Sequence, residues 1–209
     1  MKLVLVCGPW SSGTTAVAGM LDALGLDGCG PYFRTNDERT RNSFESLAFR
    51  EVIDGLASDQ TLKPTAPAKA AVAALTVFRA QLEAARGGAE AAAKAAPMFL
   101  KYPLSALLIP QICRVFDTRL VYVLRPVKDI EATRERRKWG EQFGAKGAQV
   151  IYSRMFQVLV EMPFPTLVLR YPELRANPLP HTKQLAAYSG LKKITTERLE
   201  AAASFVRRS

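Results

Sequence analysis

Residues 3–15 have the sequence LVLVCGPWSSGTT, and this stretch decides the fold. Its first four residues are a short run of leucine and valine, which is typical of a buried parallel strand. A loop of small residues, GPWSSG, follows the run, and then TTAVAGMLDALG repeats apolar and small residues at helical spacing until Gly25. The stretch therefore predicts a strand, a loop and a helix, the first unit of a parallel α/β sheet.

The loop between that strand and that helix has the form G-x-x-x-x-G-T-T over residues 8–15, the spacing of a phosphate-binding P-loop. Small residues allow successive backbone N–H groups to turn toward an anion, and the following helix adds the positive end of its dipole. Thr14 stands where nucleotide triphosphatases carry lysine, so we expect a site for one phosphate rather than for a triphosphate with Mg²⁺. The alternative is a tight strand–helix turn that binds nothing.

The rest of the chain continues the alternation. Strands are predicted at 98–102, 119–125 and 166–171, and helices at 43–57, 68–95 with a break at Gly87-Gly88, 105–116, 127–139, 146–160, 181–189 and 196–206. Residues 28–46 predict an ordered functional loop, and residues 172–180 a turn-rich segment. We therefore expect a single α/β domain, residues 1–209, with a three-layer, doubly wound, mostly parallel sheet.

Composition limits the classes of protein and partner. The 209 residues are 48% hydrophobic and 23% charged, which suits a packed core and argues against a disordered chain. The net charge of +10 favours an anionic partner: nucleic acid, acidic lipid or a multiply phosphorylated small molecule. Apolar runs stay below the ~18 residues of a membrane span, and the start does not resemble a secretory signal. Three cysteines and one histidine lack the spacing of a zinc site. We expect a cytoplasmic, reduced protein without metal or membrane.

A second motif, RPVKDIEAT at 125–133, follows the most clearly predicted strand and continues into a helix. Arg125 is then expected at the carboxyl edge of the sheet, where doubly wound folds bind ligands. Thr133 lies a little over two helical turns further on, along the same rim. A guanidinium and a hydroxyl directed at one spot predict a second anion site.

Together the two motifs resemble the nucleotide-binding motifs of sulfotransferases that use 3′-phosphoadenosine 5′-phosphosulfate (PAPS). The matching residues are Ser11, Ser12, Gly13, Thr14 and Thr15 in the first motif, and Arg125, Lys128, Asp129 and Thr133 in the second. LKYP (100–103) and LVLRYPELRANP (167–178) resemble further segments of bacterial members. The resemblance implies that the first loop holds the 5′-phosphosulfate and that Arg125 and Thr133 hold the 3′-phosphate. It also implies sulfonyl transfer to a hydroxyl or amine of a small-molecule or glycan acceptor.

The chain departs from the family pattern in three places. Ser11 replaces the basic residue that usually precedes Ser-Gly-Thr, and Lys101, at the end of a predicted strand, is our candidate substitute. The second motif has Arg-Pro-Val where Arg-x-Pro is common. The C-terminal Arg-Lys-Gly segment of cytosolic members is absent, and Arg207 and Arg208 are not equated with it.

Sulfonyl transfer needs a base for the acceptor proton and cations around the sulfonyl oxygens. N-S-F-E at 42–45 loosely resembles a glutamate-bearing segment of bacterial relatives, so we predict Glu45 as the base, with Glu38 and Asp37 behind it. The alternative places Glu45 in the first turn of a helix, where the dipole favours a carboxylate. The single histidine, His181, lies in PLPHTK and is predicted to be a surface residue.

Trp10 and the arginine-rich segments each allow two interpretations. Trp10 either stacks on a ligand or packs against the following helix. RERRKW at 134–139, like the arginines of the 28–46 loop (Arg34, Arg39 and Arg41), either attracts an anion or forms a solvated charged face. Three alternative functions remain. The first is a P-loop kinase that uses ATP and Mg²⁺, and the second is a nucleic-acid-binding protein, for which no recognition pattern is evident. The third, suggested by Ser11 in place of the usual basic residue, is a sulfotransferase homologue that binds nucleotide without transferring the sulfonyl group.

Overall fold

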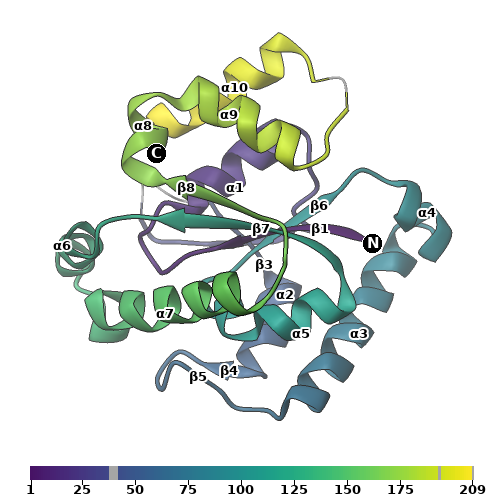
Figure 1. Cartoon of the computed structure of the whole chain (residues 1–209), viewed down its shortest axis with the longest axis horizontal. Helices are drawn as coiled ribbons and strands as arrows, with labels where there is room; N and C mark the ends of the chain where they lie inside the picture. The colour runs from purple at the N-terminus through teal and green to yellow at the C-terminus, as the bar shows by residue number, and fades with distance from the viewer. Residues whose placement is uncertain (38–41, 193, 209) are drawn as a thin grey trace.

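The computed structural model describes residues 1–37, 42–192 and 194–208. Its centre is a parallel four-stranded sheet in the order β6–β1–β7–β8 (Figure 1). The strands are β1 (Lys2–Cys7), β6 (Met98–Lys101), β7 (Asp117–Leu124) and β8 (Thr166–Arg170). Val6 of β1 lies opposite Lys101 on one side and Val121 on the other. The run that opens the chain therefore forms a central strand.

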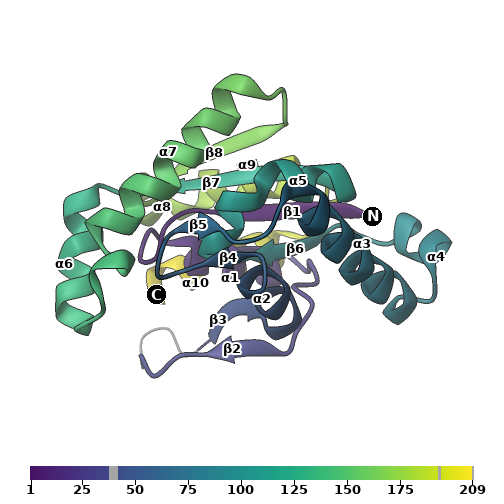
Figure 2. The ribbon, with the colours of Figure 1, turned by 90° about the horizontal axis from the view of Figure 1, so that it is seen from below.

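Helices cover both faces of this sheet, as Figures 1 and 2 show. One face packs against α1 (Thr14–Ala23), α9 (Pro178–Tyr188) and α10 (Thr196–Arg208), and the other against α2 (Leu47–Asp54), α3 (Ala68–Ala85), α5 (Ile109–Val115) and α7 (Ala145–Glu161). Leu3 and Leu5 join one apolar cluster and Val4 and Val6 the other, because successive side chains of a strand point to opposite faces. A strand buried on both sides has to be apolar throughout.

Smaller elements complete the chain. They are β2 (Tyr32–Arg34), β3 (Asn42–Ser46), β4 (Ala57–Ser58), β5 (Lys63–Pro64), α4 (Ala89–Lys94), the 3₁₀ helix η2 (Pro103–Leu108), α6 (Val127–Arg137), the 3₁₀ helix η3 (Glu141–Phe143) and α8 (Tyr171–Ala176). Strands β2 and β3 pair in antiparallel fashion, apart from the central sheet. None of the described helices combines the length and the apolar character that crossing a membrane requires.

The predicted fold class is confirmed, and so is the break of the long helix at Gly87-Gly88, where both φ angles are positive. Three local predictions were wrong. The helix predicted at 43–57 is shorter, since α2 covers only Leu47–Asp54 between β3 and β4. Residues 28–46 contain the β2–β3 pair, which is held together by packing of the buried Phe44 against Tyr32, although Phe44 itself has a positive φ of 55°. Residues 172–180 contain α8 and the start of α9, since their prolines occupy first-turn positions, where a helix needs no N–H donor.

The parallel sheet brings the ends of its strands to one edge. The phosphate loop follows β1, Lys101 ends β6, Arg125 follows β7, and Tyr171 follows β8. Residues far apart in the sequence thus meet where an open α/β sheet binds its ligands.

Candidate active site

The phosphate loop has the backbone of an anion cradle. Ser11 and Gly13 both have positive φ, 62° and 100°, and Gly13 is the N-cap of α1. Glycine supplies no side-chain cap, so N–H groups of the first turn of α1 are left for a ligand. The hydroxyls of Ser11 and Ser12 are buried and have no hydrogen-bond partner within the described part of the chain. Ser11 also lines the cavity, so its orphaned donor indicates a site built for an acceptor that the protein itself does not provide.

Tyr171 packs directly on this loop, a contact that the sequence analysis did not predict. A Cβ added to Gly13 would lie 2.2 Å from Cδ2 of the Tyr171 ring. The glycine is therefore required twice, for its positive φ and for the close approach of the ring.

We expect Gly13→Ala to lower the free energy of unfolding by more than the ~1–2 kcal/mol that a positive φ alone costs an alanine. The clash with Tyr171 should add about 1–3 kcal/mol. Gly87→Ala is the matched control, because Gly87 also has positive φ, 84°, at the left-handed C-terminus of α3, and an added Cβ would make only an ordinary contact with Ala91 at 3.6 Å. Denaturant unfolding of both variants measures the difference, and equal losses would contradict the close packing of Tyr171.

Arg125 joins the second motif to this loop. Its Nη1 donates a hydrogen bond to the carbonyl of Ser11 at 2.8 Å, and its guanidinium carbon lies 5.5 Å from the centre of the Tyr171 ring. The Tyr152 hydroxyl holds the Arg125 backbone, accepting from its N–H at 2.8 Å and donating to its carbonyl at 3.0 Å. Thr133 lines the same cavity, with its hydroxyl donating to the Asp129 carbonyl at 2.8 Å. The structure thus brings the two motifs together.

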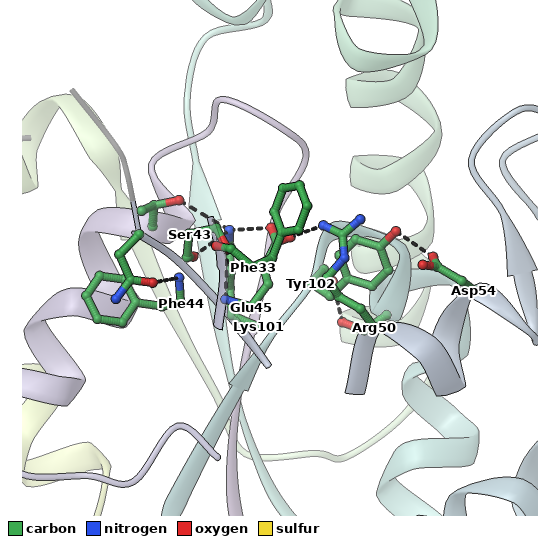
Figure 3. A network of polar contacts seen from close by, with 11 residues as sticks. Phe33, Ser43, Phe44, Glu45, Arg50, Asp54, Lys101 and Tyr102 are labelled. Carbon is green, nitrogen blue, oxygen red and sulfur yellow. Dashed lines mark hydrogen bonds and ion pairs between the residues drawn. The ribbon is translucent and has the colours of Figure 1, made fainter. Parts of the chain in front are cut away.

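Glu45 and Lys101 form a buried ion pair beside the loop (Figure 3). Both are almost fully buried, with exposures of 5% and 4%, and Nζ of Lys101 lies 2.7 Å from Oε1 of Glu45. The ammonium also donates to the Thr15 hydroxyl and to the Ser43 carbonyl, each at 3.2 Å. Glu45 lies on β3, ahead of the α2 N-cap Ser46, so the alternative placement in a helix first turn was wrong.

Arg50 binds the second oxygen of Glu45, a contact that the sequence analysis missed. Its guanidinium lies between two rings, 4.2 Å from the centre of Phe33 and 4.6 Å from that of Tyr102. The Tyr102 hydroxyl donates to Asp54 at 2.6 Å. Burial, followed by the bond to Asp54, raises the pKa of Tyr102 far above its usual range, so this hydroxyl stays protonated.

One cavity of about 800 Å³ connects these groups. Of the predicted site residues, it is lined by Ser11, Gly13, Thr14, Thr15, Glu45, Lys101, Arg125 and Thr133. Ser12 lies instead beneath the loop, close to Gly8. Among the described residues, seven basic and three acidic side chains line the cavity, so an anionic ligand is favoured there.

The remaining candidates are placed as follows. Asp37 lines the cavity and forms an ion pair with Arg137 at 2.5 Å, whereas Glu38, Arg39 and Arg41 lie outside the described residues. His181 is partly buried on α9 and does not line the cavity. No group of three or more histidine, cysteine, aspartate or glutamate side chains able to hold a metal ion occurs among the residues that the structure describes.

The aromatic and basic residues near α6 also contribute to the cavity. Trp10 both lines it and packs edge-on against Phe143, with ring centres 4.9 Å apart. Arg136 and Arg137 line it too, and Arg137 lies 4.6 Å from the centre of the Trp139 ring. For Arg137 the alternative of a wholly solvated charged face was wrong, because it also pairs with Asp37, whereas Arg136 is exposed.

No family model matches the chain, and no curated protein matches it. Among solved structures, a sulfotransferase domain from the Synechococcus PCC 7002 olefin synthase is similar, with 14% identity, a TM-score of 0.57, and coverage of 95% of this chain and 76% of that one. A sulfotransferase domain from the curacin biosynthetic pathway is similar with 17% identity, a TM-score of 0.54 and coverage of 96% and 77%. A sugar kinase from Janibacter sp. HTCC2649 has 15% identity, a TM-score of 0.49, and coverage of 90% of this chain and 94% of that one. The chain therefore has the α/β fold of sulfotransferase domains.

Proposed function

We propose that this protein is a PAPS-dependent sulfotransferase that transfers a sulfonyl group to a hydroxyl or amine of a small-molecule or glycan acceptor. The observation that carries the proposal is the joining of two anion-binding motifs on one cavity, where Arg125 reaches the Ser11 carbonyl of the phosphate loop at 2.8 Å. The fold, shared with two sulfotransferase domains, supports the same activity.

The residues present suit an anionic nucleotide. The unpartnered hydroxyl of Ser11, which lines the cavity, and the first turn of α1 supply donors for a phosphate. Arg125 and Thr133 are the proposed holders of a second phosphate, and the basic excess of the cavity favours both. When bound, PAPS supplies an activated sulfonyl group attached to a phosphate leaving group.

Lys101 is proposed to stabilise negative charge on the sulfonyl oxygens. Its ammonium lies beside the loop, 3.2 Å from the Thr15 hydroxyl, in a buried position where a fixed charge acts strongly. Lys101 thereby takes the role of the basic residue that other family members carry at the position of Ser11.

Glu45 is proposed to accept the proton of the acceptor. Lys101 and Arg50 each hold one of its oxygens, which fixes the carboxylate at the cavity wall. An ionised carboxylate has about four lone-pair sites, so capacity for the acceptor hydroxyl remains. The geometry therefore suits a positioned base.

Calorimetric titration with adenosine 3′,5′-bisphosphate tests the nucleotide part of the proposal. We expect tight binding to the wild type, weaker binding of ATP with Mg²⁺, and an affinity for the bisphosphate about 10- to 100-fold lower in Arg125→Ala. Hydrogen bonds to charged groups are worth about 1.5–3 kcal/mol, which corresponds to that range. The backbone of Arg125, not its side chain, holds Tyr152, so that contact survives the change.

Arg114→Ala is the control for the loss of one positive charge, because Arg114 is an exposed residue of α5 outside the cavity lining. It should bind the bisphosphate like the wild type. Failure of the wild type to bind it, or a preference for ATP with Mg²⁺, would overturn the proposed function.

A further inference from the structure

Arg50 lies beside Glu45, Phe33 and Tyr102, as Figure 3 shows, and it lines the cavity. The rings of Phe33 and Tyr102 lie 4.2 and 4.6 Å from its guanidinium carbon, and the bond from the Tyr102 hydroxyl to Asp54 at 2.6 Å fixes one of them. Stacking of this kind fixes the plane of a guanidinium and so the directions of its N–H groups. Arg50 is therefore pre-oriented before any ligand contacts it.

Most of the hydrogen-bonding capacity of Arg50 is unused. A guanidinium has five N–H donors, and Arg50 uses Nη1 for Glu45. Within the described part of the chain, its other N–H groups donate no hydrogen bond. The side chain is 25% exposed, and the residue lines the cavity. These free donors form the planar fork that suits a carboxylate or another oxyanion.

The local charge also favours an anion. Glu45 carries one negative charge against the two positive charges of Lys101 and Arg50, so the buried cluster keeps a surplus positive charge. Apart from Glu45, the described acids of the cavity lining are Asp59 and Asp37, and Asp37 forms an ion pair with Arg137. Outside this cluster, five basic and two acidic side chains of the described residues line the cavity, so the rest of the lining also favours an anion.

We infer that Arg50 determines acceptor specificity by binding an anionic group of the acceptor, whose substrate class is then a hydroxyl or amine compound that carries a carboxylate or a similar oxyanion. This inference rests on the proposed function, because it assigns the acceptor of the same site. Arg50 also holds Glu45, so it acts on the base and on the acceptor at once.

The test compares acceptors that differ only in charge. The probes are 4-hydroxybenzoate, 4-hydroxyphenylacetate and 4-hydroxyphenylpropionate, each paired with its methyl ester. Binding is measured calorimetrically with and without adenosine 3′,5′-bisphosphate, and kcat/KM is measured with labelled PAPS. We expect an acid to be preferred over its ester by about 10- to 100-fold, the range of a charge-assisted hydrogen bond.

In Arg50→Gln this preference should fall to about one, while Arg114→Gln, the matched loss of an exposed arginine, should keep it. Arg50→Lys keeps the charge without the fork, so it should retain part of the preference, and it replaces Arg50→Gln if that variant does not fold. If Arg50→Gln lowered kcat/KM equally for acids and esters, Arg50 would act only by positioning Glu45, and the inference would be overturned. The absence of any preference for acids in the wild type would overturn it too.

Failure of the proposed function gives a different result. In that case the bisphosphate does not bind, while the comparison of acids with esters without nucleotide still reports on Arg50. Tight nucleotide binding without a preference for acids leaves the sulfotransferase proposal intact and removes the anionic acceptor.

Discussion

Transfer by the Glu45→Gln variant is expected to fall by about 10²–10⁴-fold, the usual contribution of a positioned general base. The change keeps the shape of the side chain and removes its capacity to take up a proton. The affinity for adenosine 3′,5′-bisphosphate should stay close to that of the wild type, because Glu45 contacts Lys101 and Arg50 rather than the phosphate loop. Labelled-sulfate transfer to an acceptor panel and calorimetry together measure the two quantities.

Asp59→Asn is the matched control, since Asp59 is another carboxylate of the cavity lining. It should retain transfer. If Glu45→Gln remained fully active, or if Asp59→Asn alone lost activity, Glu45 would no longer be the proposed base.

The Lys101→Met variant is expected to lose about 3 kcal/mol of unfolding free energy, at the lower end of the range for breaking a buried ion pair. Glu45 would remain buried, and Arg50 would be its remaining cation, which limits the loss. Methionine fills a similar volume, so a cavity contributes little. Transfer should also fall, by about 10²–10³-fold, because one preorganised positive charge is removed.

A double-mutant cycle with Glu45→Gln separates the pair from the rest of the fold. In the variant that carries both changes, the loss of unfolding free energy should be smaller than the sum of the two single losses. Each single change leaves a buried charge without the partner that it had, whereas the double change removes the charges of both Lys101 and Glu45. Strictly additive losses in denaturant unfolding would contradict the direct coupling of Lys101 and Glu45.

The sequence predicted the parts of the site that depend on local spacing. The phosphate loop follows from glycines and small residues between a strand and a helix, and Arg125 from its place after the next strand of the sheet. The places of the phosphate loop and of Arg125 follow from the order of strands and helices along the chain. The family resemblance supplied Lys101, and the structure places it beside Thr15.

The missed features depend on contacts between distant segments. Arg50 contacts Phe33 and Tyr102, and Tyr171 contacts Gly13. These partners are distant in the sequence, so the sequence alone did not predict either residue as part of the candidate site. The β2–β3 pair is held by Phe44, whose ring lies between Tyr32 and Phe205. No hydrophobic period along residues 28–46 indicates such packing, because the partners come from other elements.

The direction of β1 has a practical consequence. Met1 precedes the six residues of β1, whose other end leads into the phosphate loop, so the amino terminus lies about 20 Å from the ligand-binding edge of the sheet. Figure 1 shows that terminus on the opposite side from α6. A biotin or fluorophore attached ahead of Met1 would therefore leave the mouth of the cavity unobstructed, which makes immobilised binding assays feasible with this chain.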